Sequence, residues 1–326
     1  MNILVTGGAG YIGSHVVLEL LKSDHNVITI DNLEKGHSNA VIGGDFYKAD
    51  IKDIEALRNI FSSHNIDAVI HLAAHSLVGE SVESPHKYYE NNLAGGLNLL
   101  KAMLEFSVDK IVFSSTAAVY GEPKNIPIKE SDPKDPTNPY GRSKLFFENI
   151  LADFDHSYDM KYISLRYFNA AGADSSGQIG EDHDPETHLI PLVLETALDK
   201  REKLEIFGTD YDTRDGTCIR DYIHVTDLSR AHVLAVEALF ENEESNIYNL
   251  GSGEGYSVKE VIETARKVTG LNIPAEPAER RPGDPPVLIA SSERIMDELG
   301  WERKLDDLEK IIESAWKWHV ENPDGY

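Results

Sequence analysis

A tyrosine and a lysine four residues apart, Tyr140 and Lys144, are the pair whose spacing most directly suggests chemistry. On a helix, side chains at that spacing lie one above the other on the same face. The lysine ammonium would then favour the phenolate form and lower the pKa of the tyrosine from about 10. A phenolate is a candidate general base for a substrate hydroxyl. Because the same spacing also occurs on solvated helices, the assignment depends on what surrounds the pair.

Hydroxyl side chains precede this pair in the segment 113–116, Phe-Ser-Ser-Thr. The segment ends an apolar run that is typical of a strand, so Thr116 is expected at the carboxyl edge of a sheet, where doubly wound folds bind ligands. Its hydroxyl could bond a substrate oxygen or the Tyr140 phenolate. Two alternatives stay open: Thr116 caps a turn, or Ser114 or Ser115 is the working hydroxyl.

A glycine-rich loop near the start of the chain could hold a hydride-accepting cofactor. The segment 6–13, Thr-Gly-Gly-Ala-Gly-Tyr-Ile-Gly, lies between a strand-like run and a helical pattern. Its glycines allow a tight turn and close approach to a pyrophosphate, and the helix start presents free amides to the phosphates. The loop residues expected to contact the cofactor are Gly7, Gly10, Tyr11, Ile12 and Gly13.

An acidic residue after the second strand-like run indicates which dinucleotide binds. Asp31 could accept hydrogen bonds from the adenosine ribose hydroxyls and would repel a 2′-phosphate. The following residues, Asn32 and Leu33, offer no arginine for such a phosphate. We therefore predict NAD rather than NADP, the alternative being a solvated aspartate at a strand end. Asp50 and Ile51 could flank the adenine, although Asp50 fits a helix N-cap nearly as well.

The elements that must position these residues alternate through the first half of the chain. Apolar runs predict strands at 3–6, 27–30, 68–71, 110–114 and 162–166, and helical patterns occupy 11–21, 53–61, 88–106 and 140–154. Strands that are apolar throughout indicate a parallel sheet covered on both faces. The sequence therefore predicts an α/β fold with a doubly wound parallel Rossmann-type sheet.

The pattern changes after residue 166. Segments 170–188 and 207–220 are rich in Gly, Asp, Thr and Pro and are predicted as loops. Helical patterns return at 226–240, 257–269 and 305–319, with a strand at 247–250. We predict an NAD-binding domain at 1–169, to which residues 226–250 could return, and a smaller, loop-rich C-terminal substrate domain at 170–326.

Composition and charge restrict partners and location. The net charge of −25 argues against nucleic acid and anionic membranes as partners. The one cysteine, Cys218, cannot form an internal disulfide and fits a reducing compartment. We see no secretory leader and no apolar run long enough to span a bilayer. We expect a cytoplasmic protein that acts on a small molecule, and we predict no metal site.

Together these motifs resemble the extended short-chain dehydrogenase/reductase family. In the first half the resemblance rests on the glycine loop, Asp31, His71–Ala74, Val78–Ser81, Ser114–Thr116, Tyr140-x-x-x-Lys144 and Arg166–Asn169. In the second half the motifs resemble the UDP-glucose 4-epimerase family, at Gly208–Tyr211, Asp215–Thr217, Arg220–Val225, Tyr248–Gly251 and Arg280–Asp284. The resemblance therefore covers nearly the whole chain.

This resemblance implies a mechanism. Tyr140 removes the proton of the sugar 4-hydroxyl with Thr116 as relay, and the C4 hydride moves to bound NAD+. The 4-keto sugar turns, and hydride and proton return to invert C4. A homodimer built through a four-helix bundle, including the helices at 88–106 and 140–154, is also implied. The cofactor contacts implied beyond the glycine loop, Asp31, Asp50 and Ile51 are Asn32, Leu72, Ala73, Ala74, Asn91, Ser114, Tyr140, Lys144 and Tyr167.

The resemblance also implies how the substrate is held, with the nucleotide gripped firmly and the hexose loosely. Arg220 and Arg281 could neutralise the diphosphate by bidentate contacts, the alternative being salt bridges to the many acids. The substrate contacts implied are Thr116, Tyr140, Asn169, His188, Leu189, Phe207, Arg220, Arg281 and Asp284.

Departures from the family pattern leave the sugar open. Thr187-His188 replaces a common Asn-Asn at the uridine side, and Leu288 is intermediate in size where the family limits bulk at the sugar. UDP-GlcNAc, a uronate or a pentose therefore stays open as substrate. A 4,6-dehydratase needs an acid pair after Thr116, where this chain has Ala117-Ala118. A non-catalytic NAD-binding sensor would not need the Tyr140–Lys144 pair.

Overall fold

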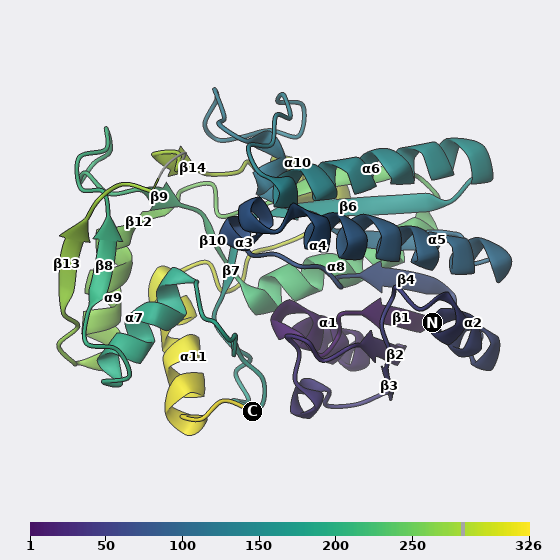
Figure 1. The fold of residues 1–326 in the computed structure, drawn as a ribbon, viewed down its shortest axis with the longest axis horizontal. Helices are drawn as coiled ribbons and strands as arrows, with labels where there is room; N and C mark the ends of the chain where they lie inside the picture. The colour runs from purple at the N-terminus through teal and green to yellow at the C-terminus, as the bar shows by residue number, and fades with distance from the viewer. Residues whose placement is uncertain (282–283) are drawn as a thin grey trace.

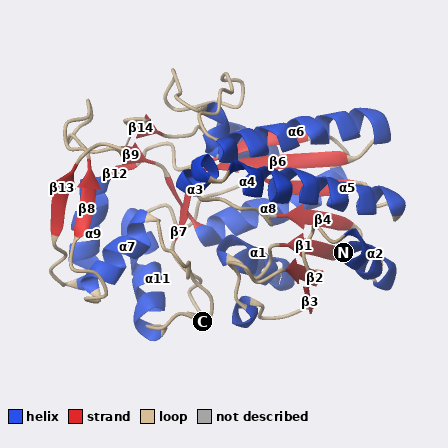
Figure 2. Ribbon diagram, viewed as in Figure 1, coloured by secondary structure: helices blue, strands red, loops and turns tan. Residues whose placement is uncertain are grey.

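A seven-stranded parallel sheet forms the centre of the computed structural model, which describes residues 1–281 and 284–326. The strand order is β11-β6-β5-β4-β1-β2-β3, with every neighbouring pair parallel. Figure 2 shows these strands between helices. The strands are β1 (Asn2–Thr6), β2 (Asn26–Asp31), β3 (Asp45–Lys48), β4 (Ala68–His71), β5 (Lys110–Ser114), β6 (Lys161–Tyr167) and β11 (Asn246–Leu250).

Helices cover both faces of this sheet. Side chains alternate between the two faces along each strand, so neighbouring residues of one strand enter opposite cores. Val5 belongs to the core packed under α1 (Tyr11–Lys22), α8 (Val225–Glu241) and α10 (Glu293–Leu299). Leu4 belongs to the opposite core, under α2 (Ile54–Ser63), α5 (Gly96–Glu105) and α6 (Pro139–Tyr158). The predicted doubly wound sheet is confirmed.

The long helix predicted at 88–106 is confirmed as a continuous helical segment, residues 85–105, but its middle is π-helical and not α-helical. The structure has α4 (Pro85–Tyr89), a π-helical segment η2 (Glu90–Gly95) and then α5. A Cβ on Gly96 would lie 2.4 Å from the ring of Phe147, and one on Gly95 would lie 2.9 Å from Ile51. The two glycines therefore let this segment pack closely against its neighbours, which an apolar period of 3.6 residues does not reveal. The strand β3 was also not predicted.

The rest of the chain builds smaller sheets around a third core that includes Val193, Ile262 and Ile311. Figure 1 shows β8, β13, α7, α9 and α11 together, to one side of the large sheet. The paired strands are β7 (Asn169–Ala171) with β10 (Tyr222–His224), β8 (Leu204–Phe207) with β13 (Ala275–Ala278), and β9 (Ile219–Arg220) with both β12 (Tyr256–Ser257) and β14 (Val287–Leu288). The helices are α7 (Leu189–Ala197), α9 (Val258–Thr269) and α11 (Leu308–Glu321).

Three short helices complete the chain: η1 (Ser38–Ala40), α3 (Val78–Glu83) and η3 (Ala117–Tyr120). Of these, η3 follows β5 directly and leads into the loop before α6, so it belongs to the site described below. Within the described ranges, none of the helices combines the length and the apolar character that crossing a membrane requires.

Candidate active site

The glycine loop joins the end of β1 to the start of α1, as the sequence predicts. Gly7 has φ +75°, and a Cβ there would lie 2.6 Å from the backbone nitrogen of Ala73. A Cβ on Gly13 would lie 2.0 Å from the Gly7 carbonyl oxygen. No described side chain caps α1 at Gly10, so the first amides of α1 are available to a phosphate. The loop fits the pyrophosphate of a dinucleotide.

Loop residues after β4 lie alongside the glycine loop. The Leu72 amide donates to the Thr6 carbonyl over 3.0 Å, and Ala73 is the residue that Gly7 approaches. The structure therefore brings the expected cofactor residues Leu72, Ala73 and Ala74 next to the loop.

Asp31 ends β2 and faces the same loop. Its Oδ2 accepts from the Ala9 amide over 3.0 Å, and its Oδ1 accepts from the Leu33 amide over 2.8 Å. Burial raises the pKa of Asp31, and the two amide hydrogen bonds partly oppose that shift. The bonds fix the carboxylate at the strand end, where it can still accept bonds from a ribose.

Asp50 lies beside Asn32, whose Nδ2 donates to Asp50 Oδ2 over 3.2 Å. The N-cap alternative for Asp50 is wrong, because Asp53 caps α2 by accepting from the amides of Glu55 and Ala56. The adjacent Ile51 is buried in the core under α2.

The first turn of α6 holds Tyr140 against the relay segment. Asn138 caps this helix by accepting from the Gly141 amide over 2.9 Å. A Cβ on Gly141 would lie 2.6 Å from the Ala118 carbonyl oxygen, so a glycine here lets α6 approach η3. Thr116 caps η3 by accepting from the Ala118 amide over 3.1 Å. The capping alternative for Thr116 is therefore correct, and its hydroxyl also lies close enough to the phenol of Tyr140 to lower the pKa of that phenol.

Lys144 is buried one turn further along α6. Its Nζ donates to the Ser114 carbonyl over 2.7 Å and lies 4.8 Å from the centre of the Phe113 ring. Desolvation lowers the pKa of Lys144 to about 7. The expected lowering of the Tyr140 pKa is wrong in direction: burial raises the pKa of Tyr140, and the hydrogen bond from Thr116 only partly opposes this. The Lys144 amine is directed at the Ser114 backbone carbonyl and is not among the causes that shift the pKa of Tyr140.

The two serines before Thr116 have other partners. Ser114 Oγ is hydrogen-bonded to the Tyr167 hydroxyl, and Ser115 Oγ donates to Glu148 Oε1 over 2.6 Å. Thr116 is therefore the hydroxyl of this run that meets Tyr140. Ser114 and Tyr167, both expected at the cofactor, lie together beside Lys144.

The π-helical segment contributes one expected residue, Asn91, and one polar residue that the sequence analysis missed, Asn92. Asn91, an expected cofactor residue, donates to Asn92 Oδ1 over 3.0 Å, and Asn92 donates to Ser143 Oγ of α6 over 3.0 Å. The ring of Tyr88 meets that of Tyr140 edge to face, with centroids 6.5 Å apart. An Asn-Asn pair followed by a Gly-Gly pair inside an amphipathic helix was the available signal.

The second part of the chain carries most of the expected substrate residues. Asn169 starts β7 and donates its side-chain amide to the Asp221 carbonyl over 2.9 Å. Leu288 in β14 packs against the core that includes Ala117, next to Thr116. His188 is the N-cap of α7, and Leu189 is its first residue.

The two cationic residues expected at the substrate, Arg281 and Arg220, have different partners, and Arg281 lies at Phe207, which ends β8. The Arg281 guanidinium stacks 4.0 Å above the Phe207 ring. Arg220 forms an ion pair with Asp284, so the salt-bridge alternative for Arg220 is correct in this structure. Its partner is another expected substrate residue. Pro282 and Gly283 of the same motif lie outside the described residues.

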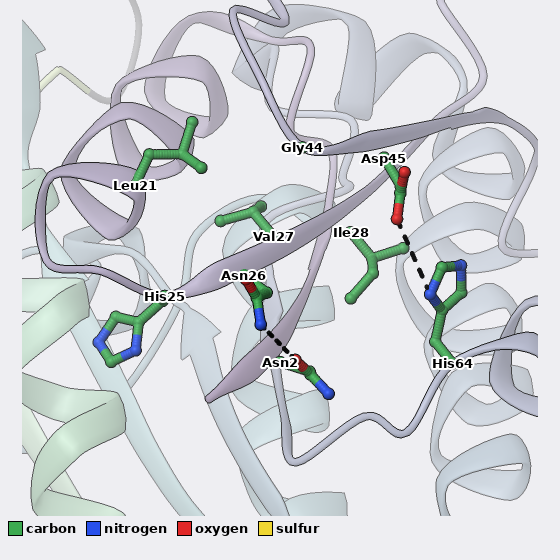
Figure 3. A pocket seen from close by; sticks show the side chains of 9 residues that line it. All are labelled: Asn2, Leu21, His25, Asn26, Val27, Ile28, Gly44, Asp45 and His64. Atoms are coloured by element: carbon green, nitrogen blue, oxygen red, sulfur yellow. Dashed lines mark hydrogen bonds and ion pairs between the residues drawn. The ribbon is translucent and has the colours of Figure 1, made fainter.

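A separate pocket of about 320 Å³ lies at the other edge of the sheet (Figure 3). Its lining residues Asn2 and Asn26 begin β1 and β2, whereas the site described above follows the strand ends. None of the predicted site residues lines this pocket.

Comparison with known proteins agrees with this geometry. The NAD dependent epimerase/dehydratase family matches residues 3–251. The UDP-glucose 4-epimerase of Halalkalibacterium halodurans is 60% identical over 326 residues, 100% of this chain and 98% of the relative. A crystal structure of a UDP-glucose 4-epimerase superposes with a TM-score of 0.98 at 52% identity, covering 100% of this chain and 99% of the other.

The UDP-glucose 4-epimerase of Brucella ovis, solved in complex with NAD, gives a TM-score of 0.95 at 47% identity, with 97% of each chain covered. The cofactor is NAD, in agreement with Asp31 and the glycine loop. These matches span both parts of the molecule. The chain therefore belongs to the NAD dependent epimerase/dehydratase family and, within it, to the family of UDP-glucose 4-epimerases.

Proposed function

We propose that this chain interconverts UDP-glucose and UDP-galactose by inverting C4 of the hexose through a transient 4-keto sugar. The observation that carries the proposal is the meeting of Thr116, Tyr140 and Lys144 at the carboxyl end of β5, beside a loop that fits a dinucleotide. A base, a relay hydroxyl and a cofactor site at one sheet edge are what reversible oxidation of a secondary alcohol requires.

The residues of the chain have the following roles in this proposal. Tyr140 takes the proton of the 4-hydroxyl, and Thr116 bridges the sugar oxygen and the phenol. Lys144 supplies a buried amine at the cofactor side, and Ser114 and Tyr167 help to hold it there. NAD, when bound, supplies a reversible hydride acceptor and a positive charge. Since burial raises the pKa of Tyr140, a nearby positive charge favours its phenolate.

Substrate grip is assigned to the part of the chain from residue 170 onward, apart from β11 and α8, which lie with the large sheet. Arg220 and Arg281 can pair with the diphosphate: Arg281 is held over the Phe207 ring, and Arg220 is held by Asp284. For Arg220 this means exchanging Asp284 for a phosphate oxygen. Asn169 lies close by in this proposal, since its side-chain amide donates to the carbonyl of Asp221, the residue after Arg220.

The test is turnover of UDP-glucose by the purified chain without added NAD, compared with Tyr140→Phe. The wild type should form UDP-galactose, and the variant should lose that activity by at least ~100-fold while its bound NAD, measured after acid release, is unchanged. A wild type that holds NAD but forms no C4 epimer from UDP-glucose would mean a sensor or a different substrate. An active Tyr140→Phe would remove the assigned base.

A second candidate, epimerisation of UDP-GlcNAc, is favoured by Leu288. This side chain is smaller than tyrosine and packs against the small core of Ala117, Val119, Tyr120 and Ile128, the first residue of which directly follows the relay Thr116 in sequence. A smaller side chain at position 288 would leave more room for the N-acetyl group of the sugar. We also propose a cytoplasmic location, supported by the one cysteine, and a homodimer, supported by the apolar residues exposed on α5 and α6.

A further inference from the structure

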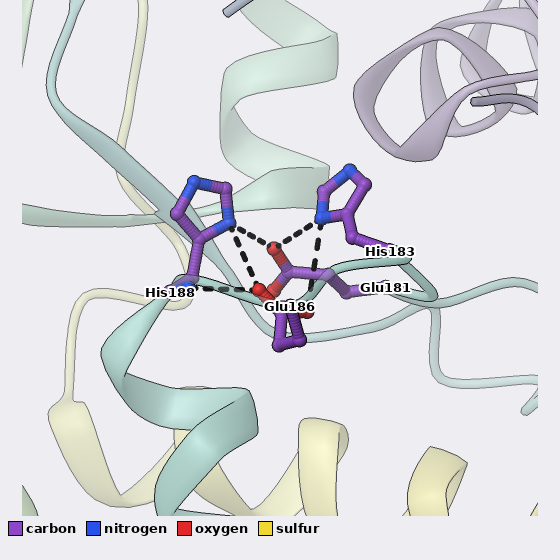
Figure 4. A group of neighbouring side chains, drawn as sticks. All are labelled: Glu181, His183, Glu186 and His188. Atoms are coloured by element: carbon purple, nitrogen blue, oxygen red, sulfur yellow. Dashed lines mark hydrogen bonds and ion pairs between the residues drawn. The ribbon is translucent and has the colours of Figure 1, made fainter. Parts of the chain in front are cut away.

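Two glutamates and two histidines converge in the loop between β7 and α7, away from Tyr140. They are Glu181, His183, Glu186 and His188, and their nearest donor atoms all lie within 4.8 Å of one another. Figure 4 shows both imidazoles directed at the two carboxylates. We propose that these four side chains bind one divalent transition-metal ion, Zn²⁺ by the nature of its donors, which fixes this loop. The proposal is independent of the proposed function.

The spacing of the donor atoms suits a tetrahedral ion. Bonds of 2.0–2.1 Å to Zn²⁺ place neighbouring ligands about 3.3 Å apart. His183 Nδ1 lies 3.3 Å from Glu181 Oε1 and 3.7 Å from Glu186 Oε2, and His188 Nδ1 lies 3.8 Å from Glu186 Oε1. Only the His188–Glu181 pair, at 2.5 Å, must open to admit an ion. Both histidines present the same nitrogen to the centre.

The charges also favour a cation. The Glu181 and Glu186 side chains are only 5% and 7% exposed. Within residues 1–281 and 284–326, the ion-pair partners of both carboxylates are these two imidazoles. Two buried carboxylates that approach one group of atoms repel each other unless positive charge lies between them. A divalent ion supplies that charge and replaces two imidazole protons.

The donor set indicates the metal. Imidazole nitrogen together with carboxylate oxygen suits Zn²⁺, whereas Mg²⁺ and Ca²⁺ prefer oxygen alone. Four protein ligands close a tetrahedral shell, as in structural zinc sites, whereas catalytic sites keep one position open. We therefore assign the ion a structural role.

The position of the loop explains what the ion would stabilise. The His183 ring packs edge to face on Tyr11 of the glycine loop, with centroids 6.0 Å apart, and the Tyr11 hydroxyl donates to the Gly172 carbonyl over 2.7 Å. On its other side, Trp318 of α11 donates to the Glu181 carbonyl over 3.1 Å. The ion would hold the loop between the cofactor-binding sheet and α11.

The sequence analysis predicted no metal site, and the four side chains are spaced Glu-x-His-x-x-Glu-x-His along the chain. The loop fold brings the four side chains together. His188 was expected to contact the substrate. As a metal ligand, it would instead hold the start of α7, of which it is the N-cap.

The experiment uses the full chain without a polyhistidine tag, stripped with a chelator and dialysed. Zn²⁺ is added, and bound metal is measured by mass spectrometry and by competition with a chromophoric chelator. We expect about one Zn²⁺ per chain, a higher thermal midpoint with the metal, and the strong visible absorption of tetrahedral Co²⁺ when Co²⁺ replaces it.

The test variant is the double substitution His183→Gln/Glu186→Gln, which removes one acid and one base. We expect its affinity for Zn²⁺ to fall by at least ~100-fold and the Co²⁺ spectrum to disappear. The matched control is His25→Gln/Glu237→Gln, which removes a His–Glu pair 3.2 Å apart elsewhere on the chain. It should bind Zn²⁺ like the wild type.

Several results would overturn the proposal. These are a wild type that binds fewer than about 0.1 Zn²⁺ per chain, equal binding by the double variant and the control, or binding of Mg²⁺ in preference to Zn²⁺. If the double variant does not fold, His183→Gln alone is measured in the same way, and unchanged affinity there would equally refute the site. None of these readouts depends on epimerase activity, so failure of this proposal leaves the proposed function untouched.

Discussion

Glu148 and Arg166 form a buried ion pair beneath the catalytic residues. Arg166 Nε lies 2.8 Å from Glu148 Oε1, and the two side chains are 3% and 1% exposed. Glu148 lies one turn after Lys144 on α6 and also accepts from Ser115, the neighbour of Thr116. The pair therefore joins the helix that carries Tyr140 to both β6 and the relay segment.

Glu148→Gln should be strongly destabilising, because it leaves the Arg166 charge buried with no opposite charge. We expect the free energy of unfolding in urea to fall by ~3–5 kcal/mol. The control is Glu105→Gln, which breaks the exposed pair with Arg58 and should cost far less stability than Glu148→Gln, because solvent screens exposed charges. If both variants lost the same free energy of unfolding, the buried pair would contribute no more to stability than the exposed pair.

The hydroxyl of Thr116 can be tested with two substitutions of similar size. Thr116→Val removes the oxygen that both caps η3 and meets Tyr140, so we expect kcat to fall by ~100-fold or more with bound NAD unchanged. Thr116→Ser keeps the oxygen and should retain most of the activity. If Thr116→Val were as active as Thr116→Ser, Ser114 or Ser115 would have to be reconsidered as the relay.

The elements that carry the chemistry were largely predictable from the sequence, because buried parallel strands and glycine loops have strong local signatures. Asp31 and the glycine loop lie where their patterns place them. The change from α- to π-helix at Glu90–Gly95 was not predictable, because the close packing of this segment involves Gly95 and Gly96 meeting side chains far away in sequence. The direction of the Tyr140 pKa shift was missed for a related reason. The spacing places Lys144 on the same face of α6 as Tyr140. Its amine, however, donates to the Ser114 carbonyl, and burial lowers its pKa, and the sequence spacing reveals neither effect.

A buried histidine should make stability depend on pH. His232 on α8 is fully buried, and burial lowers its pKa to about 4 despite the hydrogen bond to the Leu228 carbonyl. The ordinary pKa in the unfolded chain is about 6.5, so as pH falls between about 6.5 and 4 the unfolded state takes up this proton first and stability is lost. Above that window the contribution is complete.

His232→Leu should remove this effect. We expect the slope of unfolding free energy against pH, measured by urea titration within that window, to decrease by up to ~1.4 kcal/mol per pH unit. His156 on α6 is exposed, and His156→Leu is the matched control. An unchanged slope in His232→Leu would mean that other groups cause the acid sensitivity.

The proposed homodimer can be tested at one exposed ring. Phe146 on α6 is 46% exposed, and Leu97 on α5 is 42% exposed. A glutamate at position 146 would place a charge in the expected apolar interface, so Phe146→Glu should lower the mass measured by light scattering from that of a dimer to that of a monomer. Phe240→Glu, on α8 across the sheet, should leave the mass unchanged. A monomeric wild type would contradict the proposal.

Sugar selectivity should depend on the side chain at position 288. Leu288 packs against the core beside Ala117, so a larger residue there should reduce the space available to an N-acetyl group near the relay. We expect the wild type to epimerise UDP-GlcNAc as well as UDP-glucose, and Leu288→Tyr to lower kcat/KM for UDP-GlcNAc by ~10-fold or more relative to UDP-glucose. Leu288→Met, which conserves volume, should keep the wild-type ratio. Absence of UDP-GlcNAc turnover in the wild type would show that residues other than Leu288 set the limit on bulk, with Thr187 and His188 the next positions to exchange.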